Sequence, residues 1–253
     1  LPSLLFIDFD GVICDSAAEC LFSSWLAYDQ LTRPTGCTAA IIHQSTRVPA
    51  VPITLRQCFL RLRPFIRAGD DYVLIQRMLT CSNIPLCQEE FDGVRREVGS
   101  RTLSRYADAL NGVRQELLSQ DRPHWLRLNP LYKGMAELLR TADWQSTRIL
   151  STKSPQYIET ILEFYGVPVP ATAILHATNL SKLSMVTAAL DDGEAEHAVL
   201  VDDQLDHLLG NDDERITVYL ATWGYAKPDS LGDSRVPALD RAGLKALLTR
   251  RQG

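Results

Sequence analysis

Short apolar segments that end in acidic or hydroxyl residues recur along this chain and predict β-strands. The first spans Phe6 to Phe9 and is apolar enough for a strand buried on both faces. Helical patterns separate the later strands, which implies βαβ units and a parallel sheet covered by helices. The predicted strands are Thr147 to Ser151, Ala171 to His176, His197 to Val201 and Ile216 to Ala221. The predicted helices among them are Ser154 to Tyr165, Ser181 to Leu190 and Leu239 to Arg250.

More than a hundred residues with mainly helical periodicity separate the first strand from this series. The helical patterns cover Ala17 to Tyr28, Leu55 to Ile66, Asp71 to Leu79, Glu89 to Glu97 and Arg105 to Leu118. Arg33 to Pro52, rich in Thr, Pro and small residues, is interpreted as a long loop. We therefore expect an α/β core of residues 1–15 and 131–253 with a Rossmann-like parallel sheet. Residues 16–130 are expected to form an inserted, all-helical cap subdomain that closes over the strand ends.

Composition and charge narrow the function classes. The chain has 253 residues, 45% of them hydrophobic and 23% charged, as is ordinary for a globular protein. Its net charge of −5 argues against nonspecific nucleic-acid binding, which needs a basic surface. Apolar runs are too short to span a membrane, and a strand pattern occupies the place of a signal peptide. We therefore expect a cytoplasmic protein whose partner is neither nucleic acid nor membrane.

The six cysteines all lie between Cys14 and Cys87, without the C-x-x-C spacing of a metal site. Buried free thiols are the simplest interpretation, and a disulfide such as Cys81 to Cys87 is the alternative.

Acidic residues follow two of the predicted strands. Asp8 and Asp10 are spaced i, i+2, so both are expected to project from one face at the strand's end. Gly11 then allows a sharp turn where a side chain would obstruct a ligand. Asp202 and Asp203 bring a second acidic pair to a strand end. Several carboxylates at one point need a cation, and oxygen ligands with a phosphate substrate favour Mg²⁺.

Two further segments are suited to an anion. Ser151-Thr152-Lys153 places a hydroxyl and backbone amides immediately before a helix N-terminus. Lys182, at the start of the next helix, offers a compact positive charge to a phosphate or a carboxylate. Lys153 either contacts the phosphate or only flanks the helix.

In this order, these residues resemble the motifs of the haloacid dehalogenase (HAD) superfamily, in its phosphoglycolate-phosphatase-like branch with a helical cap after the first motif. Asp8 to Val12 with Asp15-Ser16 is similar to the first motif, Ser151 to the second, Lys182 to the third and Asp202-Asp203 to the fourth. Two more fragments are similar to that branch, namely Pro130 to Gly134 and Thr222 to Tyr225. Lys133 stands where a proline is usual, a departure that concerns only a helix entry.

The resemblance implies a mechanism. Asp8 would attack phosphorus, form an aspartyl-phosphate and also bind Mg²⁺. Asp10 would protonate the leaving oxygen and then activate water, while its backbone carbonyl contacts the metal. Ser151 and the Thr152 amide would hold phosphoryl oxygens, and Lys182 would neutralise charge on Asp8 and the phosphate. Asp203 is the preferred fourth-motif ligand, with Asp202 binding directly or through water.

Other polar and aromatic residues are better explained by solvent exposure or packing than by a role in the site. Asp206 is a candidate third acid but fits a solvated helix residue, in a segment from Leu205 to Leu209 with a helical pattern. Arginines between residues 56 and 67 fit a solvated helix face with an occasional anion contact. These are Arg56, Arg61, Arg63 and Arg67. Trp25, His124 and Trp125 fit packing better than substrate binding.

The leading hypothesis is a Mg²⁺-dependent phosphatase that hydrolyses a small phosphorylated metabolite. A phosphomutase or phosphotransferase would use the same aspartyl-phosphate. A non-catalytic protein that uses the fold for binding or as a scaffold is the alternative from another class. A homodimer is also left open.

Overall fold

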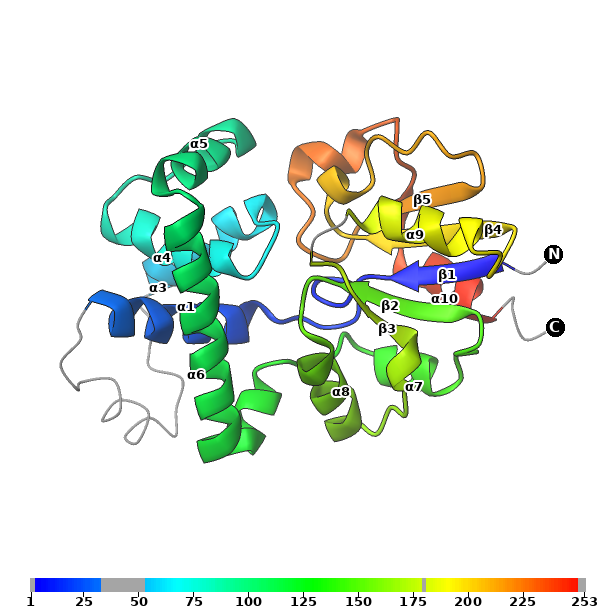
Figure 1. Cartoon of the computed structure of the whole chain (residues 1–253), viewed down its shortest axis with the longest axis horizontal. Coiled ribbons are helices and arrows are strands. Elements are labelled where there is room, and N and C mark those ends of the chain that lie inside the picture. The colour runs from blue at the N-terminus through cyan, green and yellow to red at the C-terminus, as the bar shows by residue number, and fades with distance from the viewer. Residues whose placement is uncertain (1–2, 33–52, 179–180, 250–253) are drawn as a thin grey trace. The chain divides into compact units, whose positions relative to one another are not determined.

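The computed structural model describes residues 3–32, 53–178 and 181–249, which form two compact units (Figure 1). An α/β unit comprises Leu1–Asp15 and Pro130–Gly253, and a helical insertion comprises Ser16–Asn129. The strands are β1 (Ser3–Ile7), β2 (Thr147–Ser151), β3 (Ile174–His176), β4 (His197–Asp202), β5 (Ile216–Ala221) and β6 (Ala238–Leu239). The helices of the α/β unit are α7 (Met135–Arg140), α8 (Pro155–Phe164), α9 (Lys182–Asp191) and α10 (Arg241–Thr249).

The six strands form one parallel sheet in the order β3-β2-β1-β4-β5-β6. β1 therefore lies between β2 and β4, with Ile7 opposite Ile149 on one side and Val201 on the other. This topology confirms the α/β fold with a parallel sheet and a helical insertion after the first strand. Because all the strands are parallel, their carboxyl ends meet at one edge of the sheet, where open α/β folds place their ligands.

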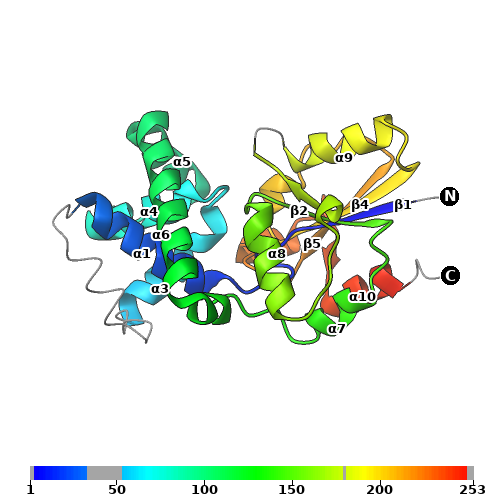
Figure 2. The same ribbon diagram turned by 60° about the horizontal axis from the view of Figure 1, so that its bottom comes forward.

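Helices cover both faces of this sheet. α9 lies on one face and α7 and α10 lie on the other, as Figure 2 shows. On the α9 face, Phe6 and Leu200 pack with Val186 and Leu190 of the helix in one buried cluster. The central strand is buried on both faces from Leu4 to Ile7, as its unbroken apolar sequence predicts.

The helical insertion is built around α1 (Ala17–Thr32) and α6 (Ser100–Arg127), which pack against each other. The shorter helices are α3 (Ile53–Leu62), α4 (Asp70–Thr80) and α5 (Gln88–Val98). α6 is broken at Asp121, whose φ of −146° and ψ of 64° are not helical and which precedes Pro123 by two residues. The helical periodicity therefore identified every helix described in the insertion, and no strand occurs in residues 16–32 and 53–129.

Several predicted elements have different bounds in the structure. β3 starts at Ile174 because Ala171–Ala173, which follows Pro170, forms a 3-10 turn instead. The final helix begins at Arg241, after a two-residue strand, β6, that is too short to show an alternating pattern. A helical pattern is predicted from Leu205 to Leu209. Within that segment only Leu205–His207 is helical, and it forms a 3-10 turn. The predicted loop from Arg33 to Pro52 lies outside the described residues.

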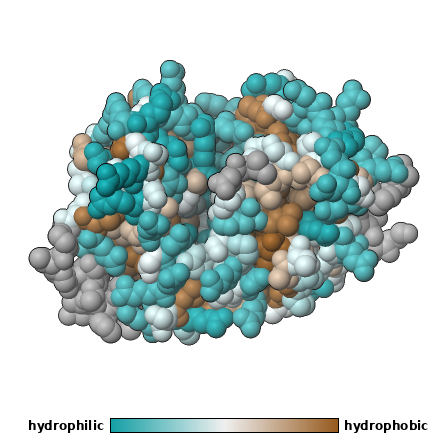
Figure 3. All heavy atoms as spheres, in the orientation of Figure 1, coloured by the Kyte–Doolittle hydropathy of each residue, from teal (hydrophilic) through white to brown (hydrophobic). Residues whose placement is uncertain are grey.

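Cysteine placement matches the prediction in part. Cys14 and Cys20 are buried and not in a disulfide, whereas Cys81 and Cys87 are exposed, and the alternative disulfide between these two is not formed. None of the helices that the structure describes is both long and apolar enough to cross a membrane. Most of the face in Figure 3 is hydrophilic, and its apolar side chains form separate patches.

Candidate active site

The carboxyl end of β1 places Asp8 in the middle of the site. Asp8 directly follows the strand, and its backbone N–H donates to the carbonyl of Val201 at 2.9 Å. The neighbouring strands end in Ser151 on one side and Asp202 on the other. Asp8, Ser151 and Asp202 have at most 5% of their surface exposed. The strand order therefore brings together three residues that are far apart in the sequence.

Lys182 binds two of the carboxylates at once. Its Nζ lies 2.8 Å from Asp8 Oδ1 and 2.6 Å from Asp202 Oδ2, and its side chain is 3% exposed. The lysine is the first residue of α9, and the Ser181 hydroxyl caps this helix by accepting from the Ser184 N–H at 3.0 Å. A buried ammonium is therefore held next to Asp8 by a helix start and by two acidic partners.

Burial and charge act against each other on these groups. Burial raises the pKa of Asp8, a rise that Lys182 opposes and Asp202 reinforces. Burial would lower the pKa of Lys182, but Asp202 and Asp8 outweigh it and raise this pKa. Burial would raise the pKa of Asp202, yet Lys182 and His207 hold it well below its usual range. Lys182 and Asp202 therefore form a charged pair at neutral pH.

Asp203 is packed closely against two glycines. A Cβ atom on Gly11 would lie 2.0 Å from Asp203 Oδ2, and one on Gly224 would lie 2.5 Å from Asp203 Cβ. Gly11 also has a φ of +95°, in the region that side chains rarely adopt. The backbone N–H of Tyr225 donates to Asp203 Oδ2 at 2.6 Å. Both glycines are therefore required for the chain to close around this carboxylate.

Asp8, Asp202 and Asp203 form a cluster that could hold a metal ion. One oxygen from each lies within 4.8 Å of the others, and all three residues are buried. With the carboxylates ionised, the buried cluster carries three negative charges next to the single positive charge of Lys182, so negative charge is in excess there. Carboxylate oxygens are the ligands of hard cations such as Mg²⁺, so this donor set fits a divalent cation of that type.

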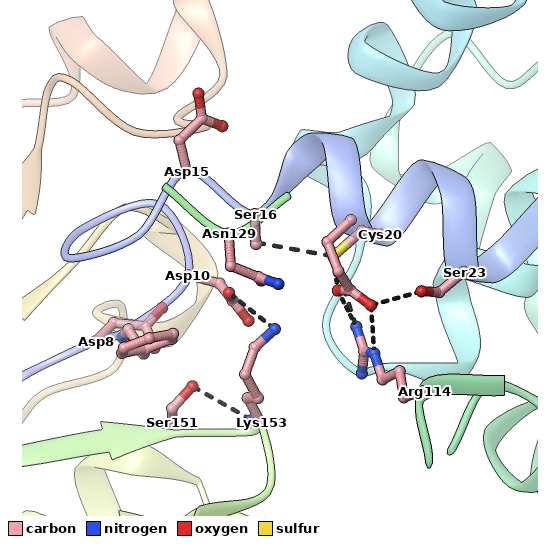
Figure 4. A network of polar contacts seen from close by, with 12 residues as sticks. Asp8, Asp10, Asp15, Ser16, Cys20, Ser23, Arg114, Asn129, Ser151 and Lys153 are labelled. Carbon is pink, nitrogen blue, oxygen red and sulfur yellow. Dashed lines mark hydrogen bonds and ion pairs between the residues drawn. The ribbon is translucent and has the colours of Figure 1, made fainter. Parts of the chain in front are cut away.

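Asp10 is held away from that cluster. β1 ends at Ile7, and Asp10 lies in the following turn, where the Gly11 N–H donates to the Cys14 carbonyl at 2.8 Å. The alternation of side chains along a strand therefore does not apply to Asp8 and Asp10. Instead, Asp10 Oδ1 lies 3.3 Å from Lys153 Nζ, and Figure 4 shows the two side chains pointing toward each other.

The segment after β2 forms a compact turn. The Ser151 hydroxyl accepts a hydrogen bond from the Lys153 N–H at 3.2 Å, and both residues are at least 95% buried. Thr152 is exposed, and its carbonyl lies 3.2 Å from His176 Nε2. Lys153 therefore does more than flank the helix, because it is buried and contacts Asp10.

Three residues of the site were not singled out from the sequence. His207 Nδ1 lies 3.0 Å from Asp202 Oδ2, and no spacing rule connects these two residues. Gly224 and Tyr225 belong to a fragment noted only for its resemblance, and Tyr225 also donates from its hydroxyl to Asp15 Oδ1 at 2.5 Å. Contacts of this kind form through tertiary packing and leave no periodic signal in the sequence.

Other candidates have structural partners. Asp206 lies in an exposed turn, 3.4 Å from Lys227, and is not part of the acidic cluster. In the helical insertion, Arg63 is buried with its guanidinium 5.2 Å from the centre of the Tyr72 ring, which contradicts its interpretation as solvated. Trp125 is fully buried, as expected of a packing residue.

Comparison with known proteins shows similarity in structure only. No protein-family model matches the sequence, and no curated protein matches it. A haloacid dehalogenase-like hydrolase of Streptococcus pneumoniae matches with a TM-score of 0.52 at 14% identity, over 98% of this chain and 97% of that one. A predicted phosphoglycolate phosphatase of Haemophilus somnus matches with a TM-score of 0.57 at 13% identity, over 98% and 97%. Protein Tyrosine Kinase A of Mycobacterium tuberculosis matches with a TM-score of 0.52 at 18% identity, over 98% of both chains.

These similarities show that the chain has the haloacid dehalogenase-like hydrolase fold with a helical insertion after β1. Because proteins named as a phosphatase and as a kinase share it, the fold alone does not identify the reaction. The reaction has to be argued from the side chains.

Proposed function

We propose that this chain, whose fold is that of haloacid dehalogenase-like hydrolases, is a Mg²⁺-dependent phosphatase that acts through an aspartyl-phosphate on a small phosphorylated metabolite. The observation that carries the proposal is the separate placement of two carboxylates. Asp8 is buried against Lys182 at 2.8 Å, while Asp10 is held by Lys153 at 3.3 Å. Two carboxylates with different partners are suited to two roles, a nucleophile and an acid/base.

In the first step, Asp8 attacks phosphorus, and the bond between phosphorus and the leaving oxygen breaks. Oδ1 of Asp8 already accepts from the Phe9 N–H at 2.7 Å and from Lys182, so we assign the attack to Oδ2. Asp10 donates a proton to the leaving oxygen. In the second step, Asp10 takes a proton from water, and the water oxygen attacks phosphorus to release phosphate and free Asp8.

Four groups are proposed to hold the phosphoryl oxygens. The Ser151 hydroxyl and the Thr152 N–H lie at the end of the strand next to Asp8. Two of the three Lys182 ammonium hydrogens serve Asp8 and Asp202, so the third is assigned to the phosphate. Gly11 lets a substrate approach the backbone closely, and Lys153 is assigned to the same anion as well as to Asp10.

The acidic cluster is proposed to hold Mg²⁺ through the carboxylates of Asp8 and Asp203, together with the backbone carbonyl of Asp10. When bound, the ion would neutralise charge on the transferring phosphoryl group. Asp202 binds directly or through water in this assignment, although Lys182, His207 and the Gln204 N–H already engage its oxygens. Selection among small phosphorylated metabolites is assigned to the helical insertion.

The test is Mg²⁺-dependent release of phosphate from a panel of phosphorylated metabolites. Wild type is compared with Asp8→Asn and with Asp212→Asn, an exposed aspartate in the loop before β5. We expect release by wild type and Asp212→Asn, loss with EDTA, recovery with added Mg²⁺, and a rate at least about 10³-fold lower for Asp8→Asn. No release from any substrate, or equal release by Asp8→Asn, would contradict the proposal. Transfer between positions of a sugar phosphate with little free phosphate would instead indicate a phosphomutase.

A further inference from the structure

His207 contacts the site from a turn that the proposed mechanism does not use. Its Nδ1 lies 3.0 Å from Oδ2 of Asp202, which is fully buried, whereas the histidine side chain is 19% exposed. Asp202 is an ionised acceptor, so the imidazole donates its Nδ1 proton to it.

The backbone on both sides of His207 is anchored by neighbouring leucines that are buried or partly buried. His207 ends the 3-10 turn Leu205–His207. The next residue, Leu208, is 1% exposed and belongs to the apolar cluster on the α9 face of the sheet. Leu205 and Leu209 are partly buried against the same cluster. The backbone that carries the imidazole is therefore anchored, so that only the side-chain torsions of His207 have to be ordered for the ring to bind Asp202.

Three donors together define the orientation of Asp202. The Gln204 N–H donates to Oδ1 at 2.8 Å, while Oδ2 accepts from both Lys182 at 2.6 Å and His207. Lys182 in turn lies 2.8 Å from Asp8. A continuous chain of contacts thus runs from an imidazole at the surface, through a buried carboxylate and an ammonium, to the nucleophile.

We propose that His207 is a positioning residue that holds Asp202 in the orientation which keeps Lys182 on Asp8. This proposal rests on the proposed function and adds to it a residue outside the reacting groups. Without the imidazole, Oδ2 of Asp202 is held by Lys182 alone and Oδ1 by the Gln204 N–H, so the carboxylate is less restrained against rotation about its Cβ–Cγ bond. The ammonium then follows the carboxylate, and small displacements of a charge-stabilising group are costly to the rate.

The test uses His207→Leu, which removes the donor, and His207→Gln, whose amide N–H₂ can still reach a carboxylate. His197, exposed at the opposite end of the same strand, β4, supplies the matched controls His197→Leu and His197→Gln. We expect kcat for phosphate release to fall about 10- to 100-fold in His207→Leu with KM changed less than about threefold. His207→Gln should recover to within about fivefold of wild type, and both His197 variants should match wild type.

A double-mutant cycle tests whether His207 acts through Asp202. In an Asp202→Ala background, His207→Leu should lower kcat by less than about twofold further, because the group that it orients is gone. An equal loss in both backgrounds, or wild-type kcat in His207→Leu, would overturn the positioning role and leave the phosphatase assignment standing. Failure of His207→Gln to recover kcat would also count against it. An inactive wild-type protein would overturn the proposed function, and this role with it.

Discussion

Replacing Arg114 by methionine should destabilise the helical insertion by about 3–5 kcal/mol, the cost of leaving one member of a buried ion pair alone. Arg114 donates two hydrogen bonds of 2.8 Å to the carboxylate of Glu19, which is fully buried. The same carboxylate accepts from the Ser23 hydroxyl at 2.6 Å and the Trp125 indole N–H at 3.2 Å.

The size of the effect follows from what each variant leaves buried. Arg114→Met preserves most of the packing of the side chain but leaves a charged Glu19 beside neutral donors, which include the Ser23 hydroxyl, the Trp125 indole N–H and the Cys20 thiol. A second change, Glu19→Gln, removes that charge and keeps an Oε1 atom that can accept from Ser23 and Trp125. The double variant should therefore lie within about 2 kcal/mol of wild type, closer than Arg114→Met alone.

Hydrogen exchange followed by mass spectrometry can measure this loss within the insertion, with peptides from α1 and α6 as reporters and peptides from β4 and β5 as internal controls. A loss of 3–5 kcal/mol corresponds to exchange about 10²- to 10⁴-fold faster in the reporter peptides, provided that the insertion closes faster than its open amides exchange, so that the opening equilibrium sets the rate. An acceleration below about fivefold in Arg114→Met would refute the reasoning. So would a double variant that exchanges faster than Arg114→Met.

Three further predictions concern the α/β unit. Gly11→Ala should cost about 1–3 kcal/mol of stability, measured by thermal unfolding, because of its φ of +95°, and should lower phosphate release because its Cβ collides with Asp203. Lys153→Met should lower kcat at least about tenfold, since Lys153 holds Asp10 in place, and should also raise KM, since Lys153 is assigned to the phosphate; an unchanged kcat would contradict this. Tyr132, whose pKa is raised by burial and by two nearby carboxylates, should stay protonated where exposed tyrosines ionise near pH about 10. The absorbance difference at 295 nm between wild type and Tyr132→Phe should then show no ionisation step between about pH 9 and 11.

Much of the fold could be predicted because the core strands are short, mainly apolar segments that end in polar residues. Thr147–Ser151 and Ile216–Ala221 have the predicted bounds in the structure. Where local preference is weak, the bounds were wrong. The two residues of β6 form a strand only because β5 offers them a partner, Leu220 opposite Ala238. Such short pairings are decided by tertiary contacts and not by the residues themselves.

The residues of the candidate site also fall into two groups, those that the sequence predicted and those that only the structure identified. The sequence identified Asp8, Asp202 and Lys182 from their places at the ends of elements, and the structure brings Lys182 into direct contact with both aspartates. The sequence did not identify His207 or Gly224 as site residues. Their roles depend on their closeness to Asp202 and Asp203, which only the folded chain shows.

By itself, therefore, the sequence determined the classes of element and the charged residues at their ends, since hydrophobic periodicity and residue chemistry are local properties. Only the tertiary structure decided that β1 lies between β2 and β4, that Asp10 turns away to Lys153, and that Asp202 is shared by Lys182 and His207. These arrangements depend on strand order and close packing between distant segments. No window of neighbouring residues contains that information.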